Sequence, residues 1–366
     1  LMGFESKGQV FRDRFLIADV KMAADFPTER WFWFDPPFHR NQSVLLHKQP
    51  DDVWRIDFQL GWEADPVAER QPERVIPRVR ALLGKDVEFS LEWVSVYTFA
   101  CLRMEKFRHG RVFFVGDAAH GVSPFGARGA NSGVQDAENL AWKLRLVLKG
   151  KAPDALLDTY AGEREKAADE NILNSTRSAD FITPKSEVSR TFRDAVLKLA
   201  KDCGFARRLV NSGRLSVPAT FADSQLNTPD REEFASAMVT GAPSMDGPVR
   251  IGRNEASFLQ QTGQEFAGVL FAGAGGATEE VLRAMRLLAR RPIPVQPLLV
   301  VPAGSMIAAA EGIVVMEDAE SVLTRRFDAR PGTYYLLRPD QHVCARWRAL
   351  EIDRVRAALA RATFNG

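Results

Sequence analysis

The stretch that decides the fold is RVFFVGDAAHGVSPFGARGANSGVQDAENLAWKL, residues 111–144. It opens on a short apolar run, Val112 to Val115, which has strand composition and ends at Gly116-Asp117. A loop rich in Gly and Pro follows from Gly121 to Gly133, and apolar residues at helical spacing begin at Val134. This order, in which a strand is followed by an acidic residue, a glycine loop and a helix start, predicts a binding site for a polar, electron-rich ligand. The free N–H groups and the dipole of a helix start favour negative charge.

Three blocks within this stretch follow a known order: Gly116-Asp117-Ala118-Ala119-His120, then Pro124-Phe125-Gly126-Ala127-Arg128-Gly129-Ala130-Asn131, then Asp136 through Leu144. This order resembles the second flavin-contact region of the class A FAD-dependent aromatic monooxygenases, the para-hydroxybenzoate hydroxylase-like enzymes. The resemblance implies FAD as the cofactor. The residues that it assigns to cofactor binding are Gly116, Asp117, Pro124, Gly126, Gly129, Ala130 and Asn131.

Elementary chemistry agrees with this assignment. The Asp117 carboxylate can accept hydrogen bonds from the hydroxyl groups of a ribityl chain. Gly126 and Gly129 allow the backbone to approach a flat ring closely. We expect His120 to cap or pack the turn rather than to take part in chemistry, and we expect Trp142 to belong to the helix core.

The family carries two further flavin signatures, a strand–GxGxxG–helix unit and an Asp-Gly motif, and neither occurs before residue 111. The opening LMGFESKGQVF resembles the segment that follows the Asp-Gly motif. The resemblance therefore implies a longer full-length enzyme, and predicts that this polypeptide alone is inactive and does not retain FAD. The run from Gly273 to Thr278 imitates a dinucleotide loop, but no acidic residue follows at a suitable distance, so we expect no nucleotide there.

The predicted fold class is α/β (α+β), with a partial FAD-binding domain of the para-hydroxybenzoate hydroxylase-like fold. Strand-like runs separated by turns, with one amphipathic helix, predict an antiparallel-sheet substrate domain over residues 1–100. Residues 101–215 are expected to form the C-terminal part of the FAD-binding domain with further helices, and residues 216–246 a linker. The element order in residues 247–366 resembles the thioredoxin-like C-terminal domain of the phenol hydroxylase and 3-(3-hydroxyphenyl)propionate hydroxylase branch, but without Cys-x-x-Cys.

The strand predicted from Val53 to Leu60 has an apolar face and a polar face, and Arg55 lies on the polar one. This polar face is either a solvated surface or a wall of the substrate pocket. Family members carry an arginine on the equivalent strand, which makes Arg55 a substrate-pocket candidate. His47, on the neighbouring strand, is a second and weaker candidate.

Composition excludes several classes of protein. The chain has 366 residues, 45% of them hydrophobic, and a net charge of +2, so it shows no charge footprint for nucleic acid or an anionic membrane. No apolar run approaches the roughly 18 residues of a membrane helix. Three scattered cysteines and five histidines give neither a disulfide framework nor metal-ligand spacing, which favours a reducing cytoplasm and predicts no metal.

The resemblance implies a mechanism as well as a cofactor. NADH or NADPH would reduce the flavin, and a flavin C4a-hydroperoxide formed with O₂ would hydroxylate a phenolic substrate. No catalytic residue can be named from the sequence. The alternatives are a polyketide-tailoring or epoxidising flavin monooxygenase and, from another class, a non-catalytic remnant that acts in assembly only. The C-terminal domain is expected to be structural or to form a subunit contact, which would make the protein a homodimer.

Overall fold

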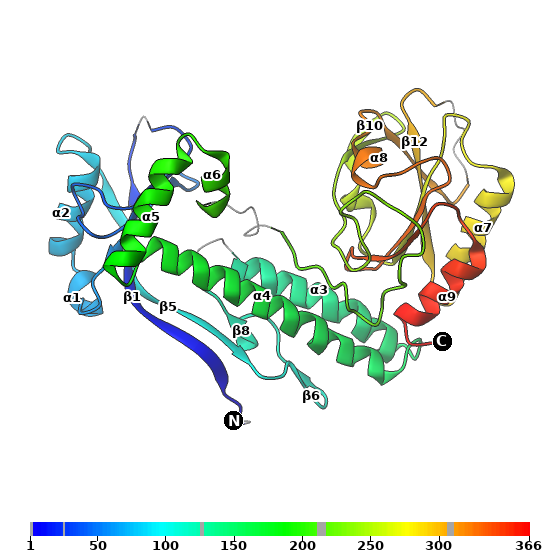
Figure 1. The fold of residues 1–366 in the computed structure, drawn as a ribbon, viewed down its shortest axis with the longest axis horizontal. Helices are drawn as coiled ribbons and strands as arrows, with labels where there is room; N and C mark the ends of the chain where they lie inside the picture. The colour runs from blue at the N-terminus through cyan, green and yellow to red at the C-terminus, as the bar shows by residue number, and fades with distance from the viewer. Residues whose placement is uncertain (1–2, 25, 125–127, 211–216, 306–310) are drawn as a thin grey trace. The chain divides into compact units, whose positions relative to one another are not determined.

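The computed structural model describes residues 3–24, 26–124, 128–210, 217–305 and 311–366. Its contacts divide the chain into two compact units. The first unit comprises Leu1–Glu105, Asp117–Ala130 and Asn171–Val217, and the second comprises Lys106–Gly116, Asn131–Glu170 and Pro218–Gly366. Figure 1 labels the elements of both units.

The first unit is built on an antiparallel sheet, in which the described strands have the order β2-β3-β4-β1-β5-β8. The hairpin between β3 and β4 turns at Asp51 and Asp52, whose φ angles of 61° and 58° suit a tight two-residue turn. The strands are β1 (Ser6–Lys21), β2 (Arg30–Trp33), β3 (Val44–Lys48), β4 (Val53–Leu60), β5 (Ser90–Met104) and β8 (His120–Gly121).

The two faces of this sheet have different surroundings. One face is apolar and packs against α2 (Pro72–Leu83), which follows the short helix α1 (Pro66–Glu69). On the other face Phe15 stacks on Phe99 with ring centroids 4.7 Å apart, and Ala179 packs against this pair. Along β4 the residues of the apolar cluster alternate with Arg55, Asp57 and Gln59. The second face is therefore the polar one that the sequence predicts.

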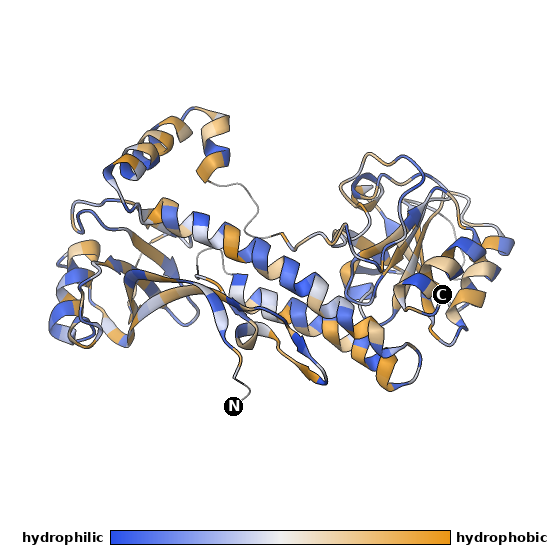
Figure 2. Ribbon diagram, turned by 60° about the horizontal axis from the view of Figure 1, so that its bottom comes forward, coloured by the Kyte–Doolittle hydropathy of each residue, from blue (hydrophilic) through white to orange (hydrophobic). Residues whose placement is uncertain are grey.

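The helices of residues 128–210 include one that begins earlier than the sequence predicts. α3 (Arg128–Leu148) begins before Val134. The sequence pattern missed this start, because the residues that precede Val134 are polar or small and show no apolar periodicity. The further helices expected in this region are α4 (Asp158–Ile182), α5 (Glu187–Ala200) and α6 (Gly204–Val210). Figure 2 shows hydrophilic and hydrophobic residues alternating along α3 and α4.

The short elements near the glycine loop are β6 (Arg108–His109) and β7 (Val112–Phe113), which pair with each other, and the 3-10 turn Gly116–Ala118. The strand is therefore shorter than the predicted run from Val112 to Val115. A second 3-10 turn, Asp154–Leu157, precedes α4.

The second unit contains a mixed sheet, in which the described strands have the order β10-β9-β13-β12-β11-β14-β15. β11, β12 and β13 are parallel neighbours, and β14 and β15 are antiparallel. The sequence analysis did not predict β9 or β10. The elements are β9 (Pro248–Ile251), β10 (Asn254–Ser257), the 3-10 turn Leu259–Gln261, β11 (Phe266–Phe271), α7 (Glu279–Ala289), β12 (Val295–Pro302), β13 (Val314–Asp318), α8 (Val322–Arg326), β14 (Tyr334–Leu337), β15 (Val343–Trp347) and α9 (Ile352–Ala362).

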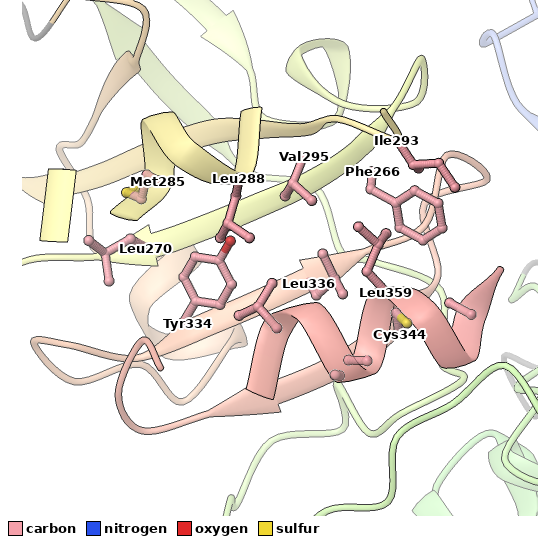
Figure 3. Packing of buried hydrophobic residues seen from close by; sticks show 14 of the residues in the cluster. Phe266, Leu270, Met285, Leu288, Ile293, Val295, Tyr334, Leu336, Cys344 and Leu359 are labelled. Carbon is pink, nitrogen blue, oxygen red and sulfur yellow. The ribbon is translucent and has the colours of Figure 1, made fainter. Parts of the chain in front are cut away.

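A hydrophobic core lies between this sheet and helices α7 and α9. Figure 3 shows Leu288 of α7 and Leu359 of α9 on either side of Leu336 of β14. Trp142 and Leu146 of α3 belong to the same buried cluster. α3 is therefore part of the core of the second unit.

Residues 217–247 contain no helix or strand. They are nevertheless packed, because Phe221, Leu226 and Met238 are buried. The ring of Phe221 stacks on His342 with centroids 4.8 Å apart. This segment therefore packs against the second unit through its buried side chains.

Candidate functional site

The backbone at Gly116 is held by a buried ion pair. Gly116 has a φ angle of 59°, and its N–H donates to Asp136 Oδ2 at 3.0 Å. Arg164 Nε donates to the other oxygen of Asp136 at 2.5 Å, and both side chains are buried. A Cβ added to Gly133 would lie 3.4 Å from the Cα of Gly116, so the two glycines let α3 approach the turn closely.

The other predicted cofactor residues lie around the start of α3. Gly129, Ala130 and Asn131 lie in its first turn. Asp117 and Pro124 are exposed. Gly126 lies outside the described residues. The glycine loop thus ends at a helix start, the geometry that favours an electron-rich group.

Arg128, which the sequence analysis did not single out, anchors this helix start within the first unit. Its side chain is buried and donates to Asn171 Oδ1 on α4. Ser123 is also buried, and its hydroxyl group forms a hydrogen bond with the hydroxyl group of Ser175 of α4, with an Oγ–Oγ distance of 2.6 Å. These two bonds fix both ends of the loop against one helix.

The residue types at the loop fit a flavin. An exposed carboxylate at Asp117 can accept hydrogen bonds from ribityl hydroxyl groups, and the N–H groups of Gly129 and Ala130 can face an electron-rich ring edge. Gly116 and Gly133 keep side chains out of the space between turn and helix. The donor set therefore has the polarity that the ribityl and pyrimidine side of FAD requires.

The run from Gly273 to Thr278 has a different structure. Gly273 and Gly276 form a tight turn, and the Thr278 side chain caps α7 by accepting from the N–H of Val281. Glu279 and Glu280 occupy the first turn of α7. A helix start that is already capped and carries two carboxylates repels a phosphate, which supports the prediction of no nucleotide there.

The last block of the motif holds a buried cluster of charges together. Asn139 Nδ2 donates to Glu163 Oε2 at 2.7 Å and to Asp340 Oδ2 at 2.9 Å. Lys143 Nζ donates to the same Glu163 oxygen at 2.9 Å. Arg338 binds Glu163 through both ends of its guanidinium group, at 2.6 and 2.9 Å, and its Nε donates to Asp340 at 2.9 Å.

The charges in this cluster are balanced and almost fully buried. Burial lowers the pKa of Lys143 to about 8, although Glu163 opposes the shift. Burial also acts to raise the pKa of Glu163, but Arg338 and Lys143 outweigh it and hold that pKa below its ordinary value. We infer that Asn139 and Lys143 dock the C-terminal part of the chain on α3, a role that their place beside a flavin motif did not suggest.

The predicted pocket residues Arg55 and His47 lie side by side on the polar face of the first sheet. Arg55 pairs with His47 of β3 and with Asp19 of β1 in the strand register. Its Nε and Nη2 atoms donate to the two Asp19 oxygens at 2.8 and 2.7 Å. The charge of Arg55 is thus neutralised by Asp19 of the same sheet. Burial lowers the pKa of His47, and the nearby charges of Arg30 and Arg55 lower it further.

Asp57, two residues along the same strand, is the most perturbed carboxylate on this face. Burial raises its pKa from 3.8 to about 6, against the opposing charges of Arg55 and Arg30, and Asp19 adds to the rise. Its Oδ1 atom is buried and has no hydrogen-bond partner among the described residues. The sequence pattern placed Asp57 on the polar face but gave no sign of this environment.

Asp57→Asn is expected to stabilise the protein at alkaline pH. A carboxyl group whose pKa is higher in the folded state binds its proton more tightly there, so the free energy of unfolding falls as pH rises from about 4 to about 6. Removing the charge should recover about 1–3 kcal/mol at pH 8 and almost nothing at pH 4. Urea unfolding at both pH values measures this, with Asp52→Asn in the exposed hairpin as control. A loss of stability at pH 8 would contradict the assignment.

The described residues offer neither a metal site nor a membrane-spanning helix. In the described part of the chain, no three His, Cys, Asp or Glu side chains come together as metal ligands would. None of the described helices has the length and apolar character that crossing a membrane requires. Cys101 and Cys344 are buried free thiols, and Cys203 is a half-buried one.

Comparison with known sequences places the glycine loop in a family context. Residues 2–175 match a family profile described as an FAD binding domain. The chain is 32% identical over 323 residues to 6-methylpretetramide 4-monooxygenase of Streptomyces rimosus, covering 83% of this chain and 54% of the relative. It is 29% identical over 300 residues to 3-(3-hydroxy-phenyl)propionate/3-hydroxycinnamic acid hydroxylase of Escherichia coli (strain K12), covering 81% of this chain and 53% of the relative. The chain thus spans about half the length of these curated relatives.

Comparison with solved structures supports the fold. The flavin-dependent monooxygenase PieE, solved with FAD and substrate, superposes with a TM-score of 0.73 at 22% identity, covering 100% of this chain and 68% of PieE. Aklavinone-11 hydroxylase, solved with FAD and aklavinone, gives a TM-score of 0.70 at 18% identity, covering 99% of this chain and 65% of the hydroxylase. The fold is therefore that of the para-hydroxybenzoate hydroxylase-like flavin monooxygenases, as predicted from residues 111–144.

Proposed function

We propose that the protein is an FAD-dependent monooxygenase that hydroxylates a phenolic ring. Residues 2–175 belong to the FAD binding domain family. Aromatic hydroxylases are homologous to this chain. The observation that carries the proposal is the helix start of α3 beside the turn at Gly116. FAD, when bound, supplies the activation of O₂ with electrons taken from NADH or NADPH.

We assign the cofactor contacts residue by residue. The Asp117 carboxylate accepts hydrogen bonds from the ribityl chain, and the backbone of Gly116, Gly129, Ala130 and Asn131 faces the ring. Pro124 and Gly126 complete the set of residues that we assign to the cofactor. Asp136 and Arg164 hold the turn in place through the Gly116 N–H.

We assign the polar face of the first sheet to the substrate. Arg55, held by Asp19, and His47 form its charged row, and half-exposed aromatic side chains lie beside them. A flat phenolic ring suits such a face, because aromatic rings bury large areas against one another. A reducing cytoplasm suits the free thiols, and we expect the C-terminal part to be structural or to form a homodimer contact.

A larger polycyclic phenol is the second candidate substrate. The relative with 32% identity is a 6-methylpretetramide 4-monooxygenase, whereas the propionate hydroxylase is 29% identical. The superposing structures include a hydroxylase bound to aklavinone. The chemistry would be the same, and only the size of the ring system would differ.

Steady-state turnover tests the proposal. The full-length enzyme that the resemblance implies, loaded with FAD and called the FAD-loaded protein from here on, should oxidise NADH or NADPH faster in the presence of a phenol. The hydroxylated product should match the nicotinamide consumed. The panel should contain 3-(3-hydroxyphenyl)propionate, simple phenols and a polycyclic phenol, each with both nicotinamides. Nicotinamide oxidation that no phenol accelerates, with no hydroxylated product, would contradict the proposed function.

A further inference from the structure

The polar face of the first sheet carries a carboxylate that its neighbours leave unsatisfied. Asp57 lies on β4, opposite Leu45 of β3 and Ile17 of β1. Its buried Oδ1 atom has no hydrogen-bond partner among the described residues. Leaving a buried carboxylate oxygen without a donor costs free energy, so this position favours a donor that the described chain does not supply.

A second unsatisfied atom lies on the same face. We call residues that are paired across neighbouring strands a row. His47 of β3 lies in the row of Arg55, next to the row of Asp57, and its buried Nδ1 atom also lacks a partner in the described ranges. By contrast, Asp19 in that row receives two hydrogen bonds from Arg55. The two residues are diagonal neighbours in the strand register, and a hydroxyl group has both functions that they leave unused, because it can donate to a carboxylate and accept from an imidazole N–H.

Aromatic side chains lie on the same face of the sheet. Phe32 of β2 lies in the same row as Asp57, next to Leu45. Trp93 and Tyr97 of β5 lie in the rows on either side, and they are 44% and 48% exposed. A ligand that carries its hydroxyl on a flat aromatic ring could cover these exposed rings while its oxygen reaches Asp57.

We propose that Asp57 is the proton acceptor for the phenolic hydroxyl group of the substrate, with His47 as the second hydrogen-bond partner of that oxygen. The inference rests on the proposed function, because it assumes a phenol on this face. The phenolic O–H bond breaks, its electron pair stays on the oxygen, and the proton forms an O–H bond with the Asp57 carboxylate. The resulting phenolate has an electron-rich ring, which is the form that an electrophilic oxygen attacks.

The charges around Asp57 suit this transfer. The charged and titratable groups that face it are Arg55 on its own strand, Arg30 of β2, His47 of β3 and Asp19 of β1. Arg30 can stabilise the phenolate that replaces the carboxylate charge, whereas Arg55 is already paired with Asp19. A pKa of about 6 leaves Asp57 ionised at neutral pH while keeping it a stronger base than an ordinary aspartate.

The test compares two phenols that differ in acidity. In the FAD-loaded protein, kcat/KM is measured for the phenol turned over fastest and for the same phenol with fluorine beside its hydroxyl group. Asp57→Asn should lower kcat/KM for the parent phenol by about 100-fold or more, since general bases contribute about 10²–10⁴-fold. The loss should be smaller, about 10-fold, for the more acidic analogue, because its proton is given up more readily and its turnover depends less on the base. Asp57→Glu should restore part of the activity, and Asp52→Asn should change neither rate.

The pH profile and a direct titration complete the test. In the wild type, kcat/KM for the parent phenol should rise with pH through about 6, and Asp57→Asn should remove that rise. The carboxyl ¹³C resonance of Asp57 in this chain should titrate near 6 and shift when 4-nitrophenol is added.

The outcomes separate this inference from the proposed function. An equal loss for both phenols, or an Asp57 resonance that 4-nitrophenol leaves unmoved, would overturn the role of Asp57 while the hydroxylase assignment stands. If the wild type turns over no phenol, the proposed function fails and the role of Asp57 fails with it.

Discussion

Replacing Arg338 with methionine is expected to lower the free energy of unfolding of the second unit by about 3–5 kcal/mol. The guanidinium group is fully buried and binds two carboxylates, Glu163 and Asp340. Without it, Glu163 keeps the hydrogen bond from Lys143, whose pKa burial already lowers. Among the described residues, Asp340 keeps only the His342 ring 3.6 Å away and the Asn139 amide. Removing one partner of a buried ion pair leaves an uncompensated charge, which costs far more than the pair contributes.

Hydrogen exchange of the β14 and β15 amides measures this effect, because it reports the opening free energy of that part of the chain. Arg356→Met is the matched control. Arg356 pairs with Asp353 at 3.0 Å on α9, but the two side chains are 44% and 87% exposed, so its loss should cost under about 1 kcal/mol. If Arg338→Met cost no more than the control, the buried cluster would not be what docks the C-terminal part on α3.

In the full-length protein, Asp117→Ala is expected to weaken FAD binding by about 1.5–3 kcal/mol, the worth of a hydrogen bond to a charged group. That free energy corresponds to a rise in Kd of about 10- to 150-fold. The side chain is exposed at the turn that follows β7, where it can accept from ribityl hydroxyl groups. Asp117→Asn keeps the shape and one acceptor oxygen, so its effect should be smaller.

Fluorescence titration of FAD with the protein gives the Kd of each variant. Asp51→Ala, in the exposed hairpin of the same unit, controls for the loss of a surface carboxylate. An FAD affinity that Asp117→Ala leaves unchanged would remove Asp117 from the cofactor site. A fall in affinity with the control as well would indicate a general effect of charge.

Local patterns in the sequence were enough to predict a glycine loop that ends at a helix start and the hairpin of the first sheet. β3 and β4 fall almost where the alternation of Val53–Leu60 and the turn before it place them. The glycine loop does end at a helix start, as the order of its residues predicts. These features depend on neighbours in the chain, which is why one sequence suffices to read them.

Long-range contacts explain what the sequence could not show. Asn139 and Asp340 are 201 residues apart in the chain, yet they share a hydrogen bond in a buried cluster. The environment of Asp57 depends on strands β1, β2 and β3, so its raised pKa has no local signature. The early start of α3 at Arg128 was missed for a different reason, since small and polar residues there carry no apolar periodicity.

Isotope labelling of the oxygen tests the central claim most directly. The FAD-loaded protein is given NADH or NADPH, a phenol that it turns over, and ¹⁸O₂ in ordinary water. The account predicts that the hydroxylated product carries one ¹⁸O atom and that omitting FAD abolishes its formation. Hydrogen peroxide as the sole product of O₂, or a product whose new oxygen comes from water, would contradict it.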